Sequence, residues 1–493
     1  MGAARGRARA RMPRRRPRSP SSSPQVAALK TTLKAELKAE LAAELGAPAG
    51  VTPAHSVEPG PVRWVTEAFS FYRGQTALVD AAIRAFGGRK AALYDASLDD
   101  EGVEWDVAYT SKQRCTDLEA AVAPGQRASC IPRLQTLTWK DSLPEVLVAA
   151  LGRGRAFNIT PPSFLIPEQE AEWHAWAAAR PDEEGGGAAW VLKELTHGKT
   201  GVTILPYADA AASAGETGDD GEHRYRVVQR YLGKQMLAEA LGGDCALRAW
   251  VLVTNLDPVR AYLFDGGIFE SNTKHLTYWQ SANEGVLGKA GAGKAASSDA
   301  ATTALGADNE KPTPWALARL ADFVGNATGS RTAFDQLWRD VASVTADAVA
   351  AGAEADHCNL PHSGWRCGER AFTPGSWELF GFDYMFDEAM KPWLLEVNAS
   401  PAIKVRSYWS ADYSAAAPDS PEAVLGREYD AEQGAVVKAY VDLLQATTVR
   451  GAHKRAGCSA TACEPYTSGA CAPGAGCETE AEMATRVGFQ PLL

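Results

Sequence analysis

The chain has 493 residues, of which 45% are hydrophobic and 22% charged, a composition typical of globular proteins and a length sufficient for two or three lobes. No run of about 18 apolar residues occurs, so the sequence predicts no membrane-spanning helix. The formal net charge is -10 although eight arginines lie in the first 20 positions. The remaining chain is therefore strongly acidic, which argues against general nucleic-acid binding.

The amino-terminal 62 residues are predicted to lie outside the folded lobes. Residues 1–25 consist largely of Arg, Ala, Pro and Ser, which cannot build an apolar core and therefore predict a disordered basic tail. An Arg-rich, acid-poor start is also typical of an organelle transit peptide or a nuclear signal, and both alternatives stay open. Between Leu29 and Gly46 leucines recur every four residues, which predicts a short helix that packs on the body, followed by a linker over residues 47–62.

Three segments in the middle of the chain contain predicted strands. Residues 189–205 predict a strand, a glycine-bearing loop and a second strand, with Lys193 at the end of the first strand. A lysine facing glycine-bearing backbone suits a phosphate clamp, although a surface lysine would look the same. Residues 227–232 predict a buried strand. Residues 247–254 predict another, in which Arg248 is either a snorkelling edge residue or a fork for phosphate or carboxylate groups.

The most informative segment is residues 377–403, WELFGFDYMFDEAMKPWLLEVNASPAI. Two apolar, aromatic-rich runs flank residues 387–392, which predicts a β-hairpin. If Asp387 and Pro392 close the loop, antiparallel pairing places Asp383 opposite Glu396. Opposed residues point to the same face of a sheet, and Asn398 points to that face as well because it lies two residues further along.

Two opposed carboxylates inside apolar strands repel each other and are costly to desolvate. A hard divalent cation removes both problems, and Mg²⁺ prefers carboxylate and amide oxygens together with substrate phosphates. The alternative is that the acids point to solvent, but their apolar neighbours leave little room for a polar face. The spacing therefore favours a metal site formed by Asp383, Glu396 and Asn398.

Residues 377–403, and above all LEVNASP at positions 395–401, resemble the ATP-grasp signature of the tubulin–tyrosine ligase family. The resemblance implies that Asp383, Glu396 and Asn398 bind the Mg²⁺ of ATP. It implies an α/β ATP-grasp fold with a small amino-terminal lobe over residues 63–136, a central lobe over 137–235 and a larger carboxy-terminal lobe over 236–450. Residues 451–493 are predicted to form a flexible, Cys-containing tail.

Other blocks match the family in its order and extend the resemblance over most of the chain. LTWKDSLPEVL at 137–147 and FNITPPSFLIP at 157–167 match two blocks before the first predicted strand, and HLT at 275–277 follows the strand that holds Arg248. By this resemblance Arg248 is the catalytic arginine that faces the phosphates and the acyl intermediate. The implied ATP-binding residues are Lys140, Lys193, Gln229, Arg230, Tyr231, Leu232 and Thr277.

The sequence departs from the family pattern on the substrate side. Ala246 and Asp244 replace an expected aspartate and lysine before Arg248, Glu270 replaces a second arginine, and Tyr278 follows the HLT block. Loss of positive charge beside a triphosphate weakens binding, by about 1–3 kcal/mol for each lost contact. These residues indicate a different substrate or reduced activity.

The resemblance implies a ligase that uses ATP and Mg²⁺ to join a free amino acid to the acidic C-terminal tail of tubulin. Tyrosine, glutamate and glycine stay open as the added residue, and the compact length favours the tyrosine type. The alternative is a weakened pseudo-enzyme that binds tubulin or another acidic tail. We expect a monomer in the cytoplasm, with association with the cytoskeleton or a cilium as an alternative, and no nucleic-acid or membrane partner. The Arg-rich start leaves an organelle or the nucleus open.

Nine cysteines are scattered along the chain, and no secretory signal precedes them. The sequence therefore predicts a reducing compartment and free thiols. The last four cysteines contain no C-x-x-C pair, which argues against a zinc site. The cysteines are Cys115, Cys130, Cys245, Cys358, Cys367, Cys458, Cys463, Cys471 and Cys477.

Overall fold

The computed structural model describes residues 60–67, 73–94, 104–109, 122, 126–180, 189–195, 201–218, 221–233, 235–236, 244–272, 315–355, 375–403, 417–448 and 479–493. They belong to one unit of the chain, which spans residues 59–493. The predicted basic tail and the predicted helix Leu29–Gly46 lie outside the described residues. So do Thr277, Tyr278 and every cysteine except Cys130 and Cys245.

A ten-stranded mixed sheet carries most of the described chain. Its order is β11-β10-β9-β12-β4-β3-β1-β2, with β13 beside β12 and β14 beside β10. Because β4 pairs in parallel with the start of β12, the predicted amino-terminal and carboxy-terminal lobes share one sheet. The strands are β1 (Arg63–Glu67), β2 (Arg89–Tyr94), β3 (Val107–Tyr109), β4 (Arg127–Ser129), β9 (Asp244–Leu256), β10 (Val259–Asn272), β11 (Trp315–Ala316), β12 (Ser376–Phe386), β13 (Pro392–Ala399) and β14 (Phe489–Pro491).

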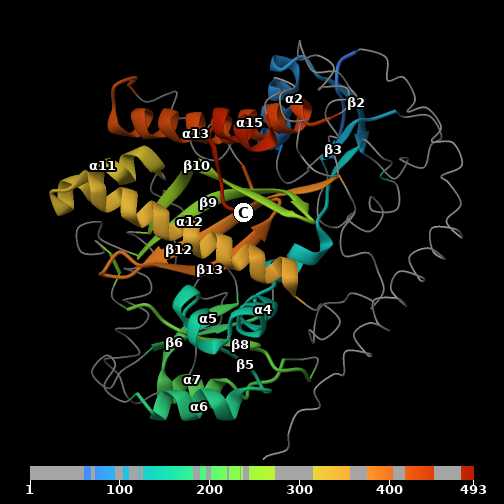
Figure 1. Ribbon diagram of the computed structural model, residues 1–493. Coiled ribbons are helices and arrows are strands. Elements are labelled where there is room, and N and C mark those ends of the chain that lie inside the picture. Colours follow the sequence, from blue (N-terminus) through green and yellow to red (C-terminus); the bar gives the residue numbers. More distant parts are fainter. Residues whose placement is uncertain are drawn as a thin grey trace, which may run out of the picture. The chain divides into compact units, whose positions relative to one another are not determined.

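Helices cover both faces of this sheet (Figure 1). Alternate residues of β9 divide between two apolar cores: Val251 packs in the core that includes α12, and Trp250 packs in the core that includes α13. None of the described helices is long and apolar enough to cross a membrane. The helices are α2 (Arg73–Ala85), α11 (Leu317–Thr328), α12 (Arg331–Glu354), α13 (Pro421–Ala446) and α15 (Glu480–Arg486).

A separate antiparallel sheet of four strands forms the central lobe, in the order β5-β8-β6-β7. Its core is aromatic and includes the buried Phe164, Trp173 and Trp190. The predicted strand, loop and strand of residues 189–205 are confirmed, because β6 pairs with β7 from Ala189↔Pro206 to Lys193↔Val202. The elements are η3 (Pro132–Thr138), α4 (Ser142–Leu151), α5 (Arg153–Ile159), β5 (Ser163–Leu165), α6 (Glu170–Ala178), β6 (Ala189–Lys193), β7 (Val202–Pro206), α7 (Tyr207–Ser213) and β8 (Val227–Arg230).

The prediction of a flexible tail over residues 451–493 is wrong for residues 479–493. These form α15 and β14, and β14 pairs antiparallel with β10. The buried Glu480 carboxylate accepts hydrogen bonds from the Thr254 hydroxyl, the Tyr262 hydroxyl (3.1 Å) and the Arg260 guanidinium (3.2 Å). The sequence signal was the Thr479-x-x-Glu482 capping box that opens α15.

Cys130 corrects the prediction of free thiols. Its side chain is buried and forms a disulfide bond. Pairing of cysteines depends on how close their backbones come in the fold, which the flanking sequence does not report.

Candidate functional site

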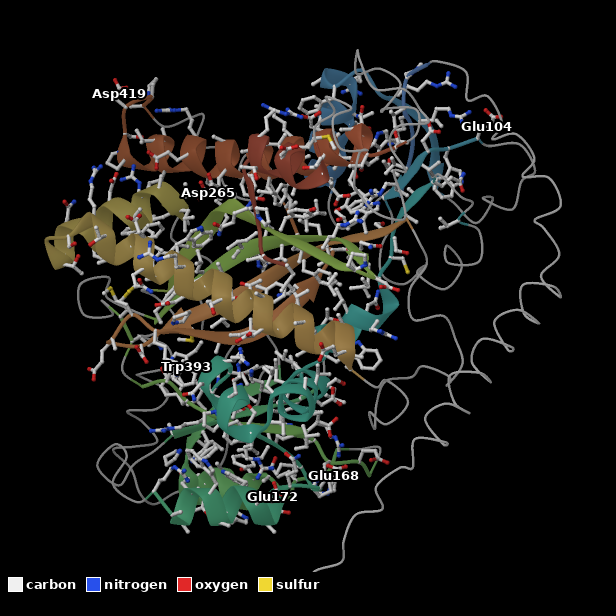
Figure 2. The ribbon with its side chains drawn as sticks, in the orientation of Figure 1. Glu104, Glu168, Glu172, Asp265, Trp393 and Asp419 are labelled. Carbon is white, nitrogen blue, oxygen red and sulfur yellow. The ribbon has the colours of Figure 1, made fainter. Side chains whose placement is uncertain are left out.

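The hairpin of β12 and β13 is shaped by its own loop. The Asp387 carboxylate accepts hydrogen bonds from the backbone N–H groups of Ala389 (2.9 Å) and Lys391 (3.0 Å). It also accepts one from the indole N–H of Trp393 (3.0 Å), which is labelled in Figure 2. These bonds satisfy the turn locally, as aspartate side chains do in Asx turns.

The predicted loop closure is wrong by one residue, yet the predicted carboxylate pair is confirmed. Pro392 faces Phe386 rather than Asp387. A one-residue bulge at Leu395 then shifts the register, so that Asp383 faces Glu396. The bulge thus cancels the error in the loop before the strands reach the acidic residues.

Arg248, Asp383 and Glu396 form a row across three adjacent strands. Arg248 of β9 pairs with Asp383 of β12, which pairs with Glu396 of β13. The Arg248 guanidinium donates two hydrogen bonds to the Asp383 carboxylate, from Nε (2.7 Å) and from Nη2 (2.6 Å). Such a bidentate pair is among the strongest contacts between side chains, and it fixes Asp383 in orientation as well as position.

Asn398 links the two carboxylates. Its side-chain Nδ2 lies 3.1 Å from Asp383 Oδ2 and 3.2 Å from Glu396 Oε1. Burial raises the pKa of Asp383 to about 7, although Arg248 opposes the shift. Burial also opposes ionisation of Glu396, but hydrogen bonds from Asp383 and Asn398 and the nearby positive charges outweigh it and lower the pKa of that carboxyl. The two acids therefore differ in their readiness to ionise.

The side-chain oxygen atoms of Asp383, Glu396 and Asn398 fit the coordination of a divalent cation. The Asn398 Nδ2 atom donates hydrogen bonds to both carboxylates, so the three side chains lie close together. Carboxylate and amide oxygens are the ligands that Mg²⁺ prefers, and two facing acids favour a dication over a monovalent one. Asp383, Glu396 and Asn398 are therefore the residues that would hold it.

Gly381 and Pro401 belong to the same site, and sequence reasoning missed them. A Cβ atom at Gly381 would lie 2.9 Å from Pro401 Cβ and 3.2 Å from Arg248 Nε. Ser400, in the left-handed region at φ 45°, turns the chain immediately before Pro401. The available signal was a lone glycine between two phenylalanines of a strand, a pattern typical of close approach by another group.

A cavity of about 560 Å³ adjoins the row of side chains. One wall comes from the segment between η3 and α4, another from Leu195 and Val202 of the central lobe, and the third from β9 and β13. The cavity therefore lies where the two sheets approach each other. It is lined by Leu137, Thr138, Trp139, Lys140, Asp141, Leu143, Leu195, Val202, Arg248, Leu395, Glu396, Val397 and Asn398.

Two lysines bring positive charge to this region. Burial lowers the pKa of Lys193 to about 8, with Glu396 opposing the shift and Lys140 adding to it. The Lys140 ammonium group donates to the backbone oxygen of Glu194 (3.2 Å), and burial lowers its pKa too. Both lysines are near enough to act on Glu396, so the predicted phosphate clamp and the predicted metal ligands lie together.

The predicted adenine-binding residues do not line this cavity. The Gln229 side chain is buried and donates to the hydroxyls of Ser163 (2.8 Å) and Thr160 (3.3 Å). The backbone N–H groups of Arg230 and Tyr231 donate to Pro162 and Ala189. Contact with adenine by residues 229–232 stays a prediction, and these bonds exclude the Gln229 amide and those two N–H groups from it.

Two of the departures from the family pattern face each other. Glu270 of β10 pairs with Ala246 of β9, two residues along from the Ile268↔Arg248 pair. The expected aspartate and the expected second arginine would have occupied these opposed positions. The two altered residues are therefore direct partners on adjacent strands.

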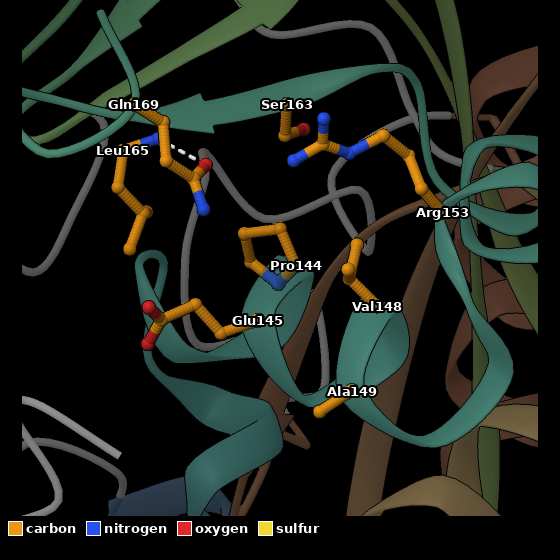
Figure 3. A pocket seen from close by; sticks show the side chains of 8 residues that line it. All are labelled: Pro144, Glu145, Val148, Ala149, Arg153, Ser163, Leu165 and Gln169. Atoms are coloured by element: carbon orange, nitrogen blue, oxygen red, sulfur yellow. Dashed lines mark hydrogen bonds between the residues drawn. The ribbon is translucent and has the colours of Figure 1, made fainter. Parts of the chain in front are cut away.

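A second, smaller cavity of about 230 Å³ lies further along α4 (Figure 3). It is lined by Pro144, Glu145, Val148, Ala149, Arg153, Ser163, Leu165 and Gln169. Burial, and then the negative charges of Asp141 and Glu168, raise the pKa of Glu145 to about 7. One carboxylate oxygen of Glu145 is buried without a hydrogen-bond partner, which makes ionisation of this residue costly.

The first prediction concerns Gly381. Gly381→Ala should weaken ATP binding, because the new methyl group meets Pro401 and the Arg248 side chain in a space that has no room for it. Calorimetric titration with ATP measures the effect. Gly434→Ala is the matched control, since a Cβ there meets nothing within 4 Å. Unchanged ATP affinity in Gly381→Ala would show that the position of Arg248 is not set by this glycine.

The second prediction concerns Lys193. Lys193→Ala should weaken the binding of ATP more than that of adenosine, since only the phosphates lose a positively charged partner. Lys438→Ala, at an exposed position of α13, controls for loss of one positive charge from the protein. Equal losses for both ligands would place the lysine away from the phosphates.

The third prediction concerns pH. The pKa of Glu145 is raised from 4.5 to about 7 in the folded protein, so the wild type loses stability as pH rises through this window, where only the unfolded chain ionises fully. Glu145→Gln removes that loss. Its thermal midpoint should exceed that of the wild type by a margin that grows between pH 4.5 and 7 and then stays constant. Glu354→Gln, an exposed glutamate at the end of α12, is the control, and a margin independent of pH would contradict the assignment.

Comparison with known sequences agrees with this geometry. The profile of the Tubulin-tyrosine ligase family matches residues 120–275 and 326–412, about half of the chain. Tubulin polyglutamylase ttll6 of Danio rerio is 24% identical over 339 residues, which cover 67% of this chain and 38% of the relative. Tubulin polyglutamylase TTLL5 of Mus musculus is 23% identical over 350 residues, 68% of this chain and 23% of the relative.

Tubulin monoglutamylase TTLL4 of Mus musculus is 27% identical over 269 residues, which cover 51% of this chain and 19% of the relative. The chain thus spans well under half the length of these three relatives. Residues 120–275 contain Lys140, Lys193 and Arg248, and residues 326–412 contain the hairpin with Asp383, Glu396 and Asn398. The matched segments, the α/β ATP-grasp architecture and the row of site residues together establish that this chain belongs to the tubulin–tyrosine ligase family.

Proposed function

We propose that this chain is an ATP-dependent carboxylate–amine ligase that adds glutamate to the acidic C-terminal tail of tubulin. The observation that carries the proposal is the register of three strands, which sets Arg248, Asp383 and Glu396 in one row beside a cavity. Positive charge from Lys140 and Lys193 lies close to the same row. This arrangement suits a triphosphate that enters together with a divalent cation.

The proposed reaction has two steps. A carboxylate oxygen of the acceptor attacks the γ-phosphorus of ATP, ADP leaves, and an acylphosphate forms. The amine of the incoming amino acid then attacks the acyl carbon, inorganic phosphate leaves and the amine loses a proton, which completes the amide bond. Mg²⁺, held by Asp383, Glu396 and Asn398, would supply neutralising charge to the phosphates.

Three basic residues of this chain would contact the phosphates and the transferring group. Lys193 lies at the end of β6 and Lys140 before α4, and their positive charges would attract the phosphates. Arg248 offers a planar fork that matches two oxygens of a phosphate or carboxylate group. Fixed donors of this kind stabilise the charge that develops during transfer, and loss of one typically costs about 10²–10³ in rate.

We propose glutamate as the amino acid that is added, in place of tyrosine, which the compact length of the chain favoured. Relatives that match more than half of this chain carry the names of tubulin polyglutamylases or a tubulin monoglutamylase. The relatives therefore support glutamate as the first donor to test.

A second candidate function is that of a pseudo-enzyme that binds an acidic tail without modifying it. The observation in its favour is the Ala246↔Glu270 pair beside the Arg248 row. A glutamate in place of an arginine replaces attraction to the phosphates with repulsion at that position. The metal-ligand side of the site shows no corresponding loss among the described residues.

The fourth prediction tests the ligase directly. Purified protein, tubulin and Mg-ATP are incubated in parallel with labelled glutamate, tyrosine or glycine. Glutamate should be incorporated into tubulin, and proteolytic removal of the tubulin tails should abolish incorporation. Glu396→Gln preserves shape but removes one charge from the metal ligands, so it should abolish transfer without unfolding the protein.

The outcomes separate the candidates. Label from tyrosine or glycine alone would overturn glutamate as the donor while retaining the ligase. Binding of ATP without transfer of any of the three amino acids would favour the pseudo-enzyme. Glu270→Arg then discriminates further, because activity that emerges only in this variant would trace the loss of chemistry to that position.

A further inference from the structure

The carboxylates of the site already have partners from the protein itself. Arg248 holds Asp383 through two short hydrogen bonds, 2.7 and 2.6 Å, and its side chain is 30% exposed while that of Asp383 is 15% exposed. The Asn398 amide nitrogen donates to both acids. Both oxygens of Asp383 thus face the guanidinium, and Oδ2 accepts a second hydrogen bond from Asn398, so these donors lie where a cation would contact the carboxylate.

The position of Arg248 is built into the strands. Arg248 and Asp383 are direct partners across β9 and β12, and the missing side chain of Gly381 leaves the space that the stem of Arg248 occupies. Pro401 closes the other side of that space. Strand register and local packing therefore place the guanidinium on Asp383.

We propose that Arg248 and the Asn398 amide substitute for a divalent cation in the unloaded site, so that cation binding displaces the guanidinium from Asp383 and releases it toward the anionic substrate. The inference rests on the metal site of the proposed function and adds an order of events to it. Arg248 then has two roles in sequence: it neutralises the acids first and the phosphates second.

Geometry and charge both support this exchange. The bidentate fork contacts both oxygens of Asp383 and so places the guanidinium on the side of the carboxylate that a cation would approach. Asn398 would have to turn its amide so that Oδ1 replaces Nδ2 beside the two acids. A guanidinium and a dication at one carboxylate also repel each other, and the low effective dielectric of a half-buried site strengthens that repulsion. The two cations are therefore competitors for Asp383.

The alternative role for Arg248 predicts the opposite sign. If Arg248 only orients Asp383 as a metal ligand, its removal should weaken metal affinity, typically 10–100-fold for a supporting residue of this kind. If Arg248 competes with the cation, its removal should strengthen metal affinity. The sign of one measurement thus distinguishes competition from support.

The experiment measures binding of Mn²⁺ alone, without nucleotide, to the full chain by electron paramagnetic resonance. Arg248→Gln should bind Mn²⁺ about tenfold or more tightly than the wild type. A second readout is thermal unfolding: without metal the variant should melt below the wild type, because the paired acids have lost their counter-charge, and Mn²⁺ should raise its midpoint more than that of the wild type.

The structure provides a matched control. Arg319 of α11 makes the same bidentate contact with Glu428 of α13, at 2.8 and 2.7 Å, and neither residue lines the cavity. Arg319→Gln removes an equal charge and an equal fork, and it should leave Mn²⁺ affinity unchanged. Tighter Mn²⁺ binding in this control would attribute the effect to net charge and overturn the proposal.

Should Arg248→Gln not fold, Arg248→Lys keeps the charge and loses the fork, and it should tighten Mn²⁺ binding by a smaller factor. Weaker or unchanged affinity in either folded variant, relative to a wild type that binds Mn²⁺, would overturn the competition while leaving the metal site in place. Failure of the wild type and both variants to bind Mn²⁺ would instead overturn the metal site of the proposed function, and the competition with it.

Discussion

Repulsion between two facing carboxylates is the constraint on which the site depends. Asp383 and Glu396 are brought together by backbone pairing of β12 and β13, and neither can move away without breaking the sheet. Burial of these strands weakens the screening of this repulsion by solvent, so positive charge from other elements stabilises the pair. Arg248 comes from the neighbouring strand, whereas Lys140 and Lys193 belong to the central lobe. The two sheets therefore approach each other at the place where positive charge balances Asp383 and Glu396.

Two sheets with different tasks follow from this arrangement. The large sheet is covered by helices on both faces, which makes it a rigid support for Arg248, Asp383 and Glu396. The four-stranded sheet is smaller and contributes lysines from strand ends and from the segment before α4. The acids are therefore fixed by long-range strand pairing, whereas the positive wall depends on short local segments. The side chains of Arg248, Asp383 and Glu396, which need the most exact geometry, therefore lie on the more constrained of the two sheets.

The sequence predicted the acidic half of the site because strands have a period of two. The period of two places Glu396 and Asn398 on one face, but their alignment with Asp383 also depends on the bulge at Leu395, which the sequence did not show. Contacts between elements distant in sequence were beyond such reasoning. Pro401 reaches Gly381 only through a left-handed Ser400, Gln229 turns its amide to Ser163 and Thr160, and Cys130 finds its disulfide partner in three dimensions. The family resemblance supplied roles for residues 229–232, but it could not report which of their donors are already used.

The pairing of β14 with β10 has a consequence for the order in which the protein can be completed during synthesis. Every other strand described here leaves the ribosome before β14 does. Until then the edge of β10 has unpaired backbone groups, and Thr254, Arg260 and Tyr262 have no Glu480 carboxylate to receive their hydrogen bonds. The nascent chain can assemble the row of Arg248, Asp383 and Glu396 while the opposite flank of the same sheet is still open. The nascent chain thus exposes one sheet edge until residues 489–491 follow, and an exposed sheet edge is the feature on which chaperones and aggregation both act.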